Sequence, residues 1–174
     1  KPKGIVCTEE RRERDSIVRF LNYPVRVTYI GRLDKDSRGL LLMTNNGDII
    51  NKMMRAGNFH EKEYKVTVDK EITPEFLNEM ERGVHILDTV TRPCKVKQIG
   101  KYTFSIVLTQ GLNRQIRRMC ETLGYKVKDL FRVRVMNIHV GKLKEGEYRL
   151  LTDRELNELY ELLKGSSNEP VQNK

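Results

Sequence analysis

One aspartate set among basic side chains is the feature of this chain best suited to chemistry. The segment 31–40 reads GRLDKDSRGL, with Asp34 between Arg32 and Lys35. Its glycines let the backbone turn tightly or approach a ligand closely. The apolar run 40–43 predicts a buried strand that holds the loop rigidly. A carboxylate held in this way can act as a nucleophile or a base on a polyanionic substrate. The alternative is a solvated turn residue, the usual role of an aspartate in a charged loop.

A basic segment further along the chain supplies possible partners for that carboxylate. The sequence NRQIRRM predicts a helix that begins near Asn113, whose side chain can cap it. Arg114, Arg117 and Arg118 then share one helix face at spacings of three and four residues. Burial favours the neutral form of a carboxylate, whereas a neighbouring arginine would keep Asp34 charged. The alternative is an ordinary basic helix face that contacts solvent or phosphate, which suits Arg114 and Arg118 better than Arg117.

Patterns of helix and strand alternate along the chain and predict an α+β fold with a large mixed or mostly antiparallel sheet. Tyr64, Val66 and Val68 alternate with polar residues, which indicates a half-buried strand. Thr73, followed by proline, predicts a helix start, and Gly83 predicts its end. The other predicted helices cover residues 16–21, 48–55 with Asp48 as cap, and 152–163 with Leu156, Leu159, Tyr160 and Leu163 on one face. The other predicted strands cover residues 5–8, 25–30, 90–97, 102–109 and 127–140.

The composition favours a globular protein with an anionic partner. The 174 residues include 33 Lys and Arg against 24 Asp and Glu, a formal charge of +9, and this excess favours a partner such as RNA. Cys7, Cys94 and Cys120 are odd in number and far apart, so we predict neither a disulfide framework nor a zinc site. No long apolar run and no signal-peptide pattern is present, so we expect a cytoplasmic protein that does not enter a membrane.

Four segments of the chain follow the order of motifs in a known family. The first is GRLDKDSRGLLLMT, the motif around Asp34, and the other three are KPKG at residues 1–4, HEKEY at 60–64 and GLNRQIRRM at 111–119. Together they resemble the RsuA family of bacterial ribosomal RNA pseudouridine synthases over about residues 1–163. The sequences of residues 58–68 and 109–121 are most similar to those of the branch that modifies large-subunit rRNA. Ser37 stands where many relatives carry threonine, and both side chains have a hydroxyl.

The resemblance implies a fold and a reaction. The fold would be that of a pseudouridine synthase, with helices flanking the sheet and two lobes around a central cleft that holds the active site. The reaction would convert uridine to pseudouridine in rRNA, here 23S rRNA, by breaking the C1′–N1 bond, turning the base and joining C1′ to C5. The atomic composition of the nucleotide does not change in this isomerisation, so we expect no cofactor. The carboxylate could attack C1′ or remove a proton from C2′, and both routes stay open.

The resemblance also assigns roles to residues. Asp34 would be the essential carboxylate, Arg117 its ion-pair partner, and Tyr64 the platform on which the target uracil stacks. The target uridine must leave its stack at a cost of a few kcal/mol, and Arg32 is expected to help by filling the vacated space or holding a phosphate. Arg114 and Arg118 are expected to bind RNA. A looser track for the RNA backbone could include Lys35, Arg38, Arg55, Lys62, Arg132 and Arg134, each of which is as easily a solvated charge.

We expect one catalytic domain over residues 1–164 and a disordered tail over 165–174. The chain begins with Lys1 rather than Met, and relatives of this type carry an S4-like RNA-binding domain before this point. We therefore expect that the chain is part of a longer protein, with that domain missing here. No heptad repeat calls for association, so we expect a monomer without an obligate protein partner.

Two other functions compete with the enzyme. The first is a catalytically silent RNA-binding or ribosome-assembly module that keeps the fold. The second is a metal-dependent nuclease in which Asp34 and Asp36 bind Mg²⁺. No other acidic cluster in the sequence completes a coordination shell, so we predict no metal.

Overall fold

A six-stranded mixed sheet forms the centre of the fold. The computed structural model describes residues 1–55 and 58–167, in which five helices and ten strands are present. The helices are α1 (Ile17–Leu21), α2 (Gly47–Met54), α3 (Pro74–Arg82), α4 (Gln115–Thr122) and α5 (Asp153–Leu163). The first strands are β1 (Thr28–Ile30), β2 (Arg38–Gly39), β3 (Leu42–Thr44), β4 (Lys62–Val68) and β5 (His85–Ile86). The others are β6 (Thr89–Val90), β7 (Lys95–Gln98), β8 (Thr103–Leu108), β9 (Val127–Val135) and β10 (Ile138–His139).

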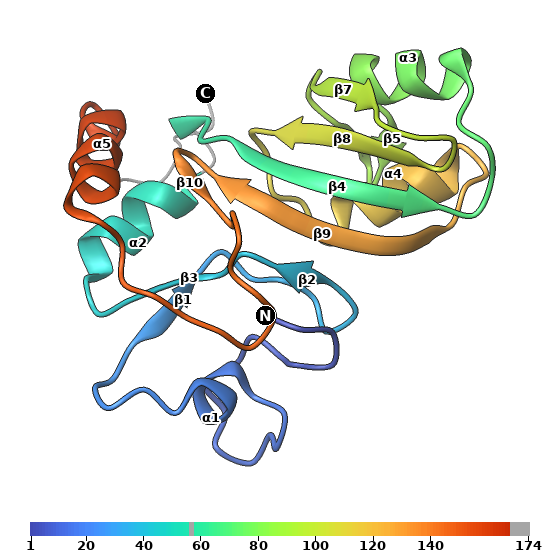
Figure 1. Ribbon diagram of the computed structural model, residues 1–174. Coiled ribbons are helices and arrows are strands. Elements are labelled where there is room, and N and C mark those ends of the chain that lie inside the picture. Colours follow the sequence, from blue (N-terminus) through green and yellow to red (C-terminus); the bar gives the residue numbers. More distant parts are fainter. Residues whose placement is uncertain (56–57, 168–174) are drawn as a thin grey trace.

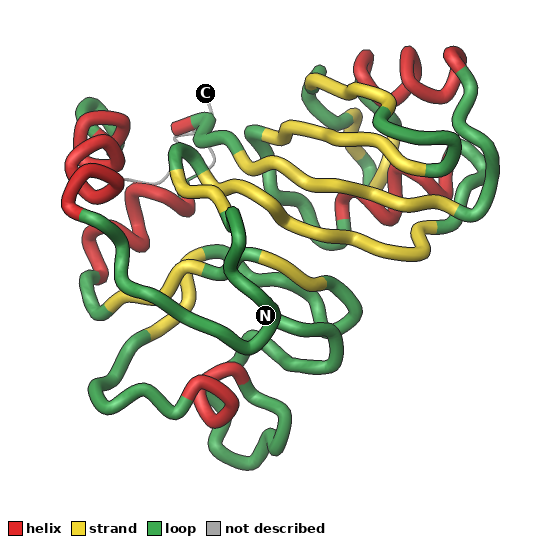
Figure 2. Tube along the Cα trace, viewed as in Figure 1, coloured by secondary structure: helices red, strands yellow, loops and turns green. Residues whose placement is uncertain are grey.

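The order in the large sheet is β10-β9-β4-β8-β7, and β2 pairs with β9 outside this path. All of these pairs are antiparallel except β2–β9, which is parallel. Figure 1 shows α3 beside β7 and α4 close to β5 and β9, with α2 and α5 near β10 at the other edge of the sheet. Figure 2 shows that the region around the N-terminus is mostly loop. The predicted α+β fold with a mixed, mostly antiparallel sheet is therefore confirmed.

One face of the sheet and two helices enclose the first hydrophobic cluster. Along β8 the side chains alternate between buried and half-buried, with Phe104, Ile106 and Leu108 pointing inward, as expected for a strand with one face in the core. Phe76 of α3 and Met119 of α4 pack against this face. Burial of these apolar side chains is the main driving force that holds the helices on the sheet.

A second hydrophobic cluster lies where β1, β3, α2 and α5 meet the end of β9. Its buried members include Leu42, Met53, Val135 and Leu159. The long strand β9 joins both clusters, because its Leu130 belongs to the first and its Val135 to the second. The loop that carries Asp34 lies between β1 and β3 in the sequence, so this second cluster anchors both of its flanks.

The ends and buried faces of the helices can be compared with those predicted from the sequence. Helix α3 has the predicted bounds, with Thr73 as its N-cap. Asp48 is not the cap of α2, because the side chain of Asn46 accepts the capping hydrogen bonds. Asn113 is not the cap of α4 either, since that position is taken by Arg114 in the left-handed region at φ 50°. In α5, Leu159 is buried as predicted, but Tyr160 is 45% exposed.

Some predicted strands are shorter than expected. Residues 5–8 contribute only an isolated bridge from Val6 to Ser16. The strand expected over 25–30 is limited to β1, and the apolar run after Asp34 becomes a strand only at Leu42. The segment 90–97 divides between β6 and β7. Most of the tail predicted to be disordered, residues 168–174, lies outside the described residues.

Gly39 is a point at which the sheet accepts no side chain. Its φ is +124°, and a β-carbon there would lie 2.3 Å from the carbonyl oxygen of Arg132 on the neighbouring strand. We expect Gly39→Ala to lower the free energy of unfolding by about 3 kcal/mol, because both strain and a backbone clash result. Gly47→Ala is the control, since Gly47 begins α2 with open space around it, and it should stabilise by about 0.5 kcal/mol. Urea unfolding of both variants measures the difference, and equal stability would contradict the expectation.

Candidate active site

The loop of residues 31–40, called the Asp34 loop below, follows β1 as the sequence predicted. A turn closes within it, where the Ser37 amide donates to the Asp34 carbonyl oxygen at 3.0 Å. The KPKG segment holds the loop from outside, because the Gly4 amide donates to the Lys35 carbonyl at 2.8 Å. The Lys1 ammonium donates to the Ser37 carbonyl at 2.7 Å. The KPKG segment and the Asp34 loop therefore form one unit in space, although the residues that join them are more than thirty positions apart in the sequence.

A buried arginine fixes both ends of the Asp34 loop. Arg132 of β9 is 1% exposed. Its Nε donates to the Leu40 carbonyl at 2.9 Å, and its Nη2 donates to the Gly31 carbonyl at 3.1 Å. Its backbone carbonyl also accepts from the Leu40 amide at 2.8 Å. The expectation that Arg132 forms part of a surface track for RNA is therefore wrong, because its guanidinium lies inside the protein.

An irregularity in the sheet decides where Arg132 points. Tyr64 pairs with Arg132 and Glu63 pairs with Arg134, so Val133 is an extra residue on β9. In such a β-bulge, two residues of one strand lie opposite one residue of the other. Arg132 and Arg134, which would share a face in a regular strand, are thus directed to opposite faces. Tyr64 shares the face of Arg132, and that is the face against which the Asp34 loop is held.

Arg134 and Arg38, two other members of the expected RNA track, are also engaged within the protein. Arg134 contacts Glu61 and Glu63 at 3.2 and 3.3 Å on the opposite side of the sheet. Arg38 binds both carboxylate oxygens of Asp129 at 3.0 and 2.8 Å. This contact, together with Lys3, lowers the pKa of Asp129 to about 2. Both arginines therefore stabilise the fold around the loop.

Arginines of the GLNRQIRRM segment contact the Asp34 loop, but their pairing differs from the predicted one. Nη1 of Arg114 lies 3.5 Å from Oδ2 of Asp34. The same guanidinium donates to both oxygens of Asp36 at 3.0 and 2.9 Å. Arg117 lies 3.5 Å from Oδ2 of Asp36, and it donates to the Asp36 carbonyl at 3.0 Å and to Oγ of Ser37 at 3.2 Å. These hydrogen bonds from Arg114, with the charge of Arg117, lower the pKa of Asp36.

The predicted ion pair between Arg117 and Asp34 is therefore not found among the described residues, and Arg114 is the arginine beside Asp34. The cause is local. Arg114 lies at the N-cap in the left-handed region, so it does not share the helix face of Arg117 and reaches the loop from the helix end. Arg118 turns back to donate to Asn113 at 3.0 Å. Only Arg114 and Arg117 of the expected three contact the loop.

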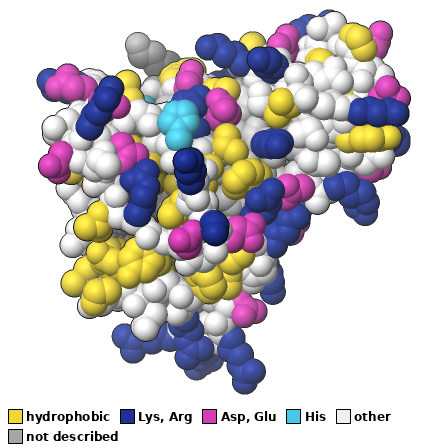
Figure 3. All heavy atoms as spheres, in the orientation of Figure 1, with side chains coloured by type: hydrophobic (Ala, Val, Ile, Leu, Met, Phe, Trp, Pro, Cys, Tyr) yellow, Lys and Arg dark blue, Asp and Glu magenta, His cyan; other side chains and the backbone are white. Residues whose placement is uncertain are grey.

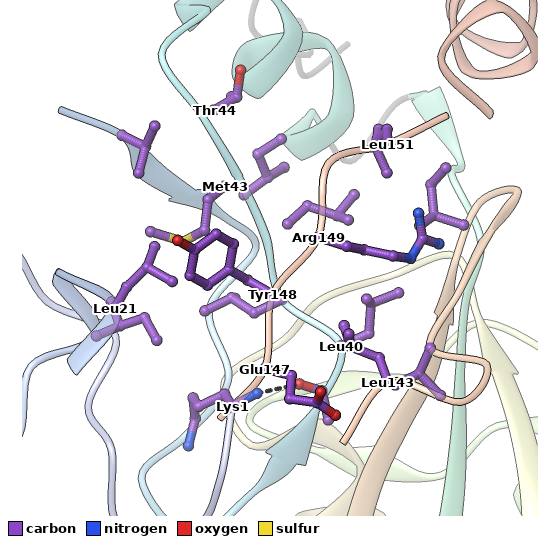
Figure 4. A pocket seen from close by; sticks show the side chains of 18 of the residues that line it. Lys1, Leu21, Leu40, Met43, Thr44, Leu143, Glu147, Tyr148, Arg149 and Leu151 are labelled. Carbon is purple, nitrogen blue, oxygen red and sulfur yellow. Dashed lines mark hydrogen bonds between the residues drawn. The ribbon is translucent and has the colours of Figure 1, made fainter. Parts of the chain in front are cut away.

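The predicted site residues lie apart from a large apolar pocket. That pocket has a volume of about 650 Å³ and is lined by apolar side chains that include Leu21, Met43 and Tyr148 (Figure 4). Figure 3 shows a hydrophobic patch in the same region, beside the segment that connects β10 with α5. None of Asp34, Tyr64, Arg32, Arg114, Arg117 and Arg118 lines it. The predicted site residues lie instead on the Asp34 loop, on α4 with its cap, and on β4, where Arg32 is exposed and Tyr64 is half-buried.

No cluster suited to a metal ion accompanies Asp34 and Asp36 in the parts of the chain that the structure describes. Both oxygens of Asp36 accept hydrogen bonds from Arg114, and one oxygen of Asp34 faces the same guanidinium. A cation with oxygen ligands would compete with a fixed positive charge at this point. The arrangement is suited to a carboxylate that acts directly on an organic substrate.

The motifs, the fold and this site agree with one family of enzymes. Residues 1–122 match the RNA pseudouridylate synthase family, and the chain belongs to that family. It is 59% identical over 169 residues to the dual-specificity RNA pseudouridine synthase RluF of Escherichia coli, covering 97% of this chain and 58% of the relative. It is 37% identical over 177 residues to the ribosomal large subunit pseudouridine synthase B of Bacillus subtilis, covering 97% and 72%. The predicted family and its RluF-like branch are confirmed.

Solved structures agree with this assignment. A crystal structure of a pseudouridylate synthase superposes with a TM-score of 0.85 at 30% identity, covering 91% of this chain and 70% of that one. A more distant likeness, to an H/ACA RNP bound to a substrate RNA, has a TM-score of 0.52 at 16% identity and concerns the fold alone. The chain spans a little more than half the length of the RluF relatives.

Sequence reasoning missed two participants in the site. Arg132 was placed on the surface, because nothing in the sequence around it marks a β-bulge. Asp36 was considered as a possible Mg²⁺ ligand of the alternative nuclease, whereas it joins Arg114 and Arg117 to the Asp34 loop. The signal that could have revealed Asp36 was its place two residues from Asp34 in a motif that faces a basic segment.

Proposed function

We propose that this chain converts uridine to pseudouridine in ribosomal RNA, with 23S rRNA as its substrate and without a cofactor. Membership of the family supports the reaction, and the names of the RluF and large-subunit relatives support the substrate. The observation that carries the proposal is Asp34, which lies in a loop fixed at both ends by Arg132 and faces a guanidinium 3.5 Å away. Its side chain is 39% exposed, so a flipped nucleotide can reach it.

The reaction we propose begins with the target uridine leaving its stack, with Arg32 assisting and Tyr64 supporting the base. Asp34 then acts on the sugar while the C1′–N1 bond breaks. The base turns, C1′ bonds to C5, and the hydrogen of C5 is lost to solvent as N1 gains a proton. Arg114, 3.5 Å away, supplies a positive charge beside Asp34. Arg117 acts on the loop through Asp36 and Ser37, which makes it a positioning residue in this proposal.

The test uses RNA that carries tritium at C5 of uridine, because only formation of the C1′–C5 bond releases that label. Release by the protein, in the presence of a strong chelator, is the expected result. Binding of the RNA without release would instead favour the catalytically silent module. Release of nucleotides that depends on a divalent metal would favour the nuclease.

Tyr64 provides a prediction that separates stacking from hydroxyl chemistry. Replacing Tyr64 with Ala should raise KM for RNA about tenfold, because stacking of one base contributes about 1–3 kcal/mol. Tyr64→Phe keeps the ring and should keep KM within about twofold. Both values come from the tritium assay, and an equal loss in the two variants would contradict the stacking role.

The remaining expectations on organisation belong to the same proposal. One catalytic domain of two lobes over residues 1–164 is supported by the two hydrophobic clusters that β9 joins. In the part of the chain that the structure describes, the helices are too short or too polar to cross a membrane. We propose a monomer that acts on rRNA in the cytoplasm without an obligate protein partner.

A further inference from the structure

Two cations lie together against the base of the Asp34 loop. A β-carbon built on Gly31 would lie 3.7 Å from Nη1 of Arg132 and 3.8 Å from Cε of Lys62. Neither Lys62 nor Arg132 belongs to any ion pair of the described residues. The nearby acids Glu61 and Glu63 contact Arg134 instead. The pair therefore carries positive charge that no carboxylate neutralises.

The surroundings make this charge costly. Burial, and after it the charge of Arg132, lowers the pKa of Lys62 to about 8. The charge of Lys62 in turn contributes to the lowered pKa of His60, after burial. Two partly desolvated cations without an anion destabilise the folded chain. Groups that are kept at such a cost are concentrated at functional sites.

The direction of Lys62 connects it to the site. Residues 62–67 of β4 pair with β8 without a shift in register, so Lys62 and Tyr64 project from the same face of β4. Two residues along a strand span about 7 Å, which is comparable to the distance from a nucleobase to the phosphate of its own nucleotide. Arg132 projects from that face as well, opposite Tyr64.

We propose that Lys62 binds a backbone phosphate of the substrate RNA beside the nucleotide that stacks on Tyr64. The phosphate supplies the negative charge that the Lys62–Arg132 pair lacks. Arg132 stays in place as the clamp of the loop, since its hydrogen bonds to Gly31 and Leu40 are already made. This assignment rests on the proposed function, because it takes RNA as the substrate.

Three variants of β4 test the assignment. Lys62→Met removes the charge but keeps a side chain of similar length, whereas Lys62→Arg keeps the charge. Lys65→Met is the matched control, because it also replaces a lysine with methionine, but at an exposed position on the opposite face of β4. We expect Lys62→Met to weaken RNA binding about tenfold and to reduce the slope of log affinity against log salt by about 1. Lys62→Arg and Lys65→Met should keep the original salt slope.

Thermal unfolding and pH distinguish binding from a structural role. Because Lys62→Met removes an uncompensated charge, it should raise Tm by about 3 °C at pH 7. With Arg132 and His60 as its neighbours, Lys62 loses its proton as pH rises above about 8. RNA affinity of the natural protein should therefore decline above that pH, and that of Lys62→Arg should not.

An unchanged salt slope in Lys62→Met, or a fall in its Tm, would overturn the phosphate site. Those results leave the proposed function standing, provided that the natural protein releases tritium from RNA. If the natural protein releases none, the proposed function itself fails, whatever the Lys62 variants bind.

Discussion

Replacement of Asp34 by Asn will abolish tritium release from 5-labelled uridine in RNA and leave RNA binding almost unchanged. The amide keeps the size of the side chain but cannot act as a nucleophile or accept a proton as a base. We expect kcat to fall about a thousandfold or more. The affinity for RNA should stay within about threefold, because the loop is held by contacts of its backbone with Arg132, Gly4 and Lys1. Single-turnover tritium release and a filter-binding titration measure the two effects.

Asp36→Asn is the informative control, because the same change is made two residues away. Asp36 holds Arg114 and Arg117 against the loop, so its amide variant should reduce kcat only about tenfold through a less well-placed Asp34. The two variants thus distinguish a carboxylate that takes part in the reaction from one that positions the loop. Equal losses in both variants, or normal release by Asp34→Asn, would remove Asp34 from its assigned role.

Replacement of Arg132 by Met will reduce kcat about a hundredfold with little change in KM for RNA. The guanidinium is buried and ties the Gly31 and Leu40 carbonyls together. Without it, both ends of the Asp34 loop lose a charge-assisted hydrogen bond, and a displacement of about 1 Å at the reacting group can cost about 10²-fold in rate. Burial keeps Arg132 away from substrate, so binding is affected less than turnover. Steady-state kinetics in the tritium assay separate the two constants.

Two further variants make the Arg132 prediction specific. The lysine of Arg132→Lys can donate to one carbonyl at a time, so the kcat of this variant should be about tenfold higher than that of Arg132→Met. Arg134→Met removes the neighbouring arginine on the opposite face, where it contacts Glu61 and Glu63, and should keep kcat within about threefold. A general loss of folding would affect kcat in proportion to the unfolded fraction measured by circular dichroism. If Arg134→Met impairs turnover as much as Arg132→Met, Arg132 is not the clamp of the loop.

Local signals in the sequence were reliable where the structure depends on neighbouring residues. Helix α3 begins and ends as predicted, because Thr73 and Pro74 define its start and Gly83 its end by short-range geometry. The cap of α4 was assigned wrongly because Arg114 adopts a left-handed conformation, which its sequence does not reveal. The same conformation places Arg114, rather than the predicted Arg117, beside Asp34.

The sequence by itself determined the family and predicted Asp34 as the reactive group, because the motif around Asp34 and the three segments that accompany it are contiguous runs of residues. Only the tertiary structure decided which cations serve that group. Arg132 is ninety-two residues from Leu40, whose carbonyl it binds, and it reaches the loop because a bulge at Val133 turns it away from Arg134. Lys62 shares that face through the register of β4 with β8. Strand register and bulges depend on packing between distant segments, and for that reason the partners of Asp34 could not be assigned from the motifs alone.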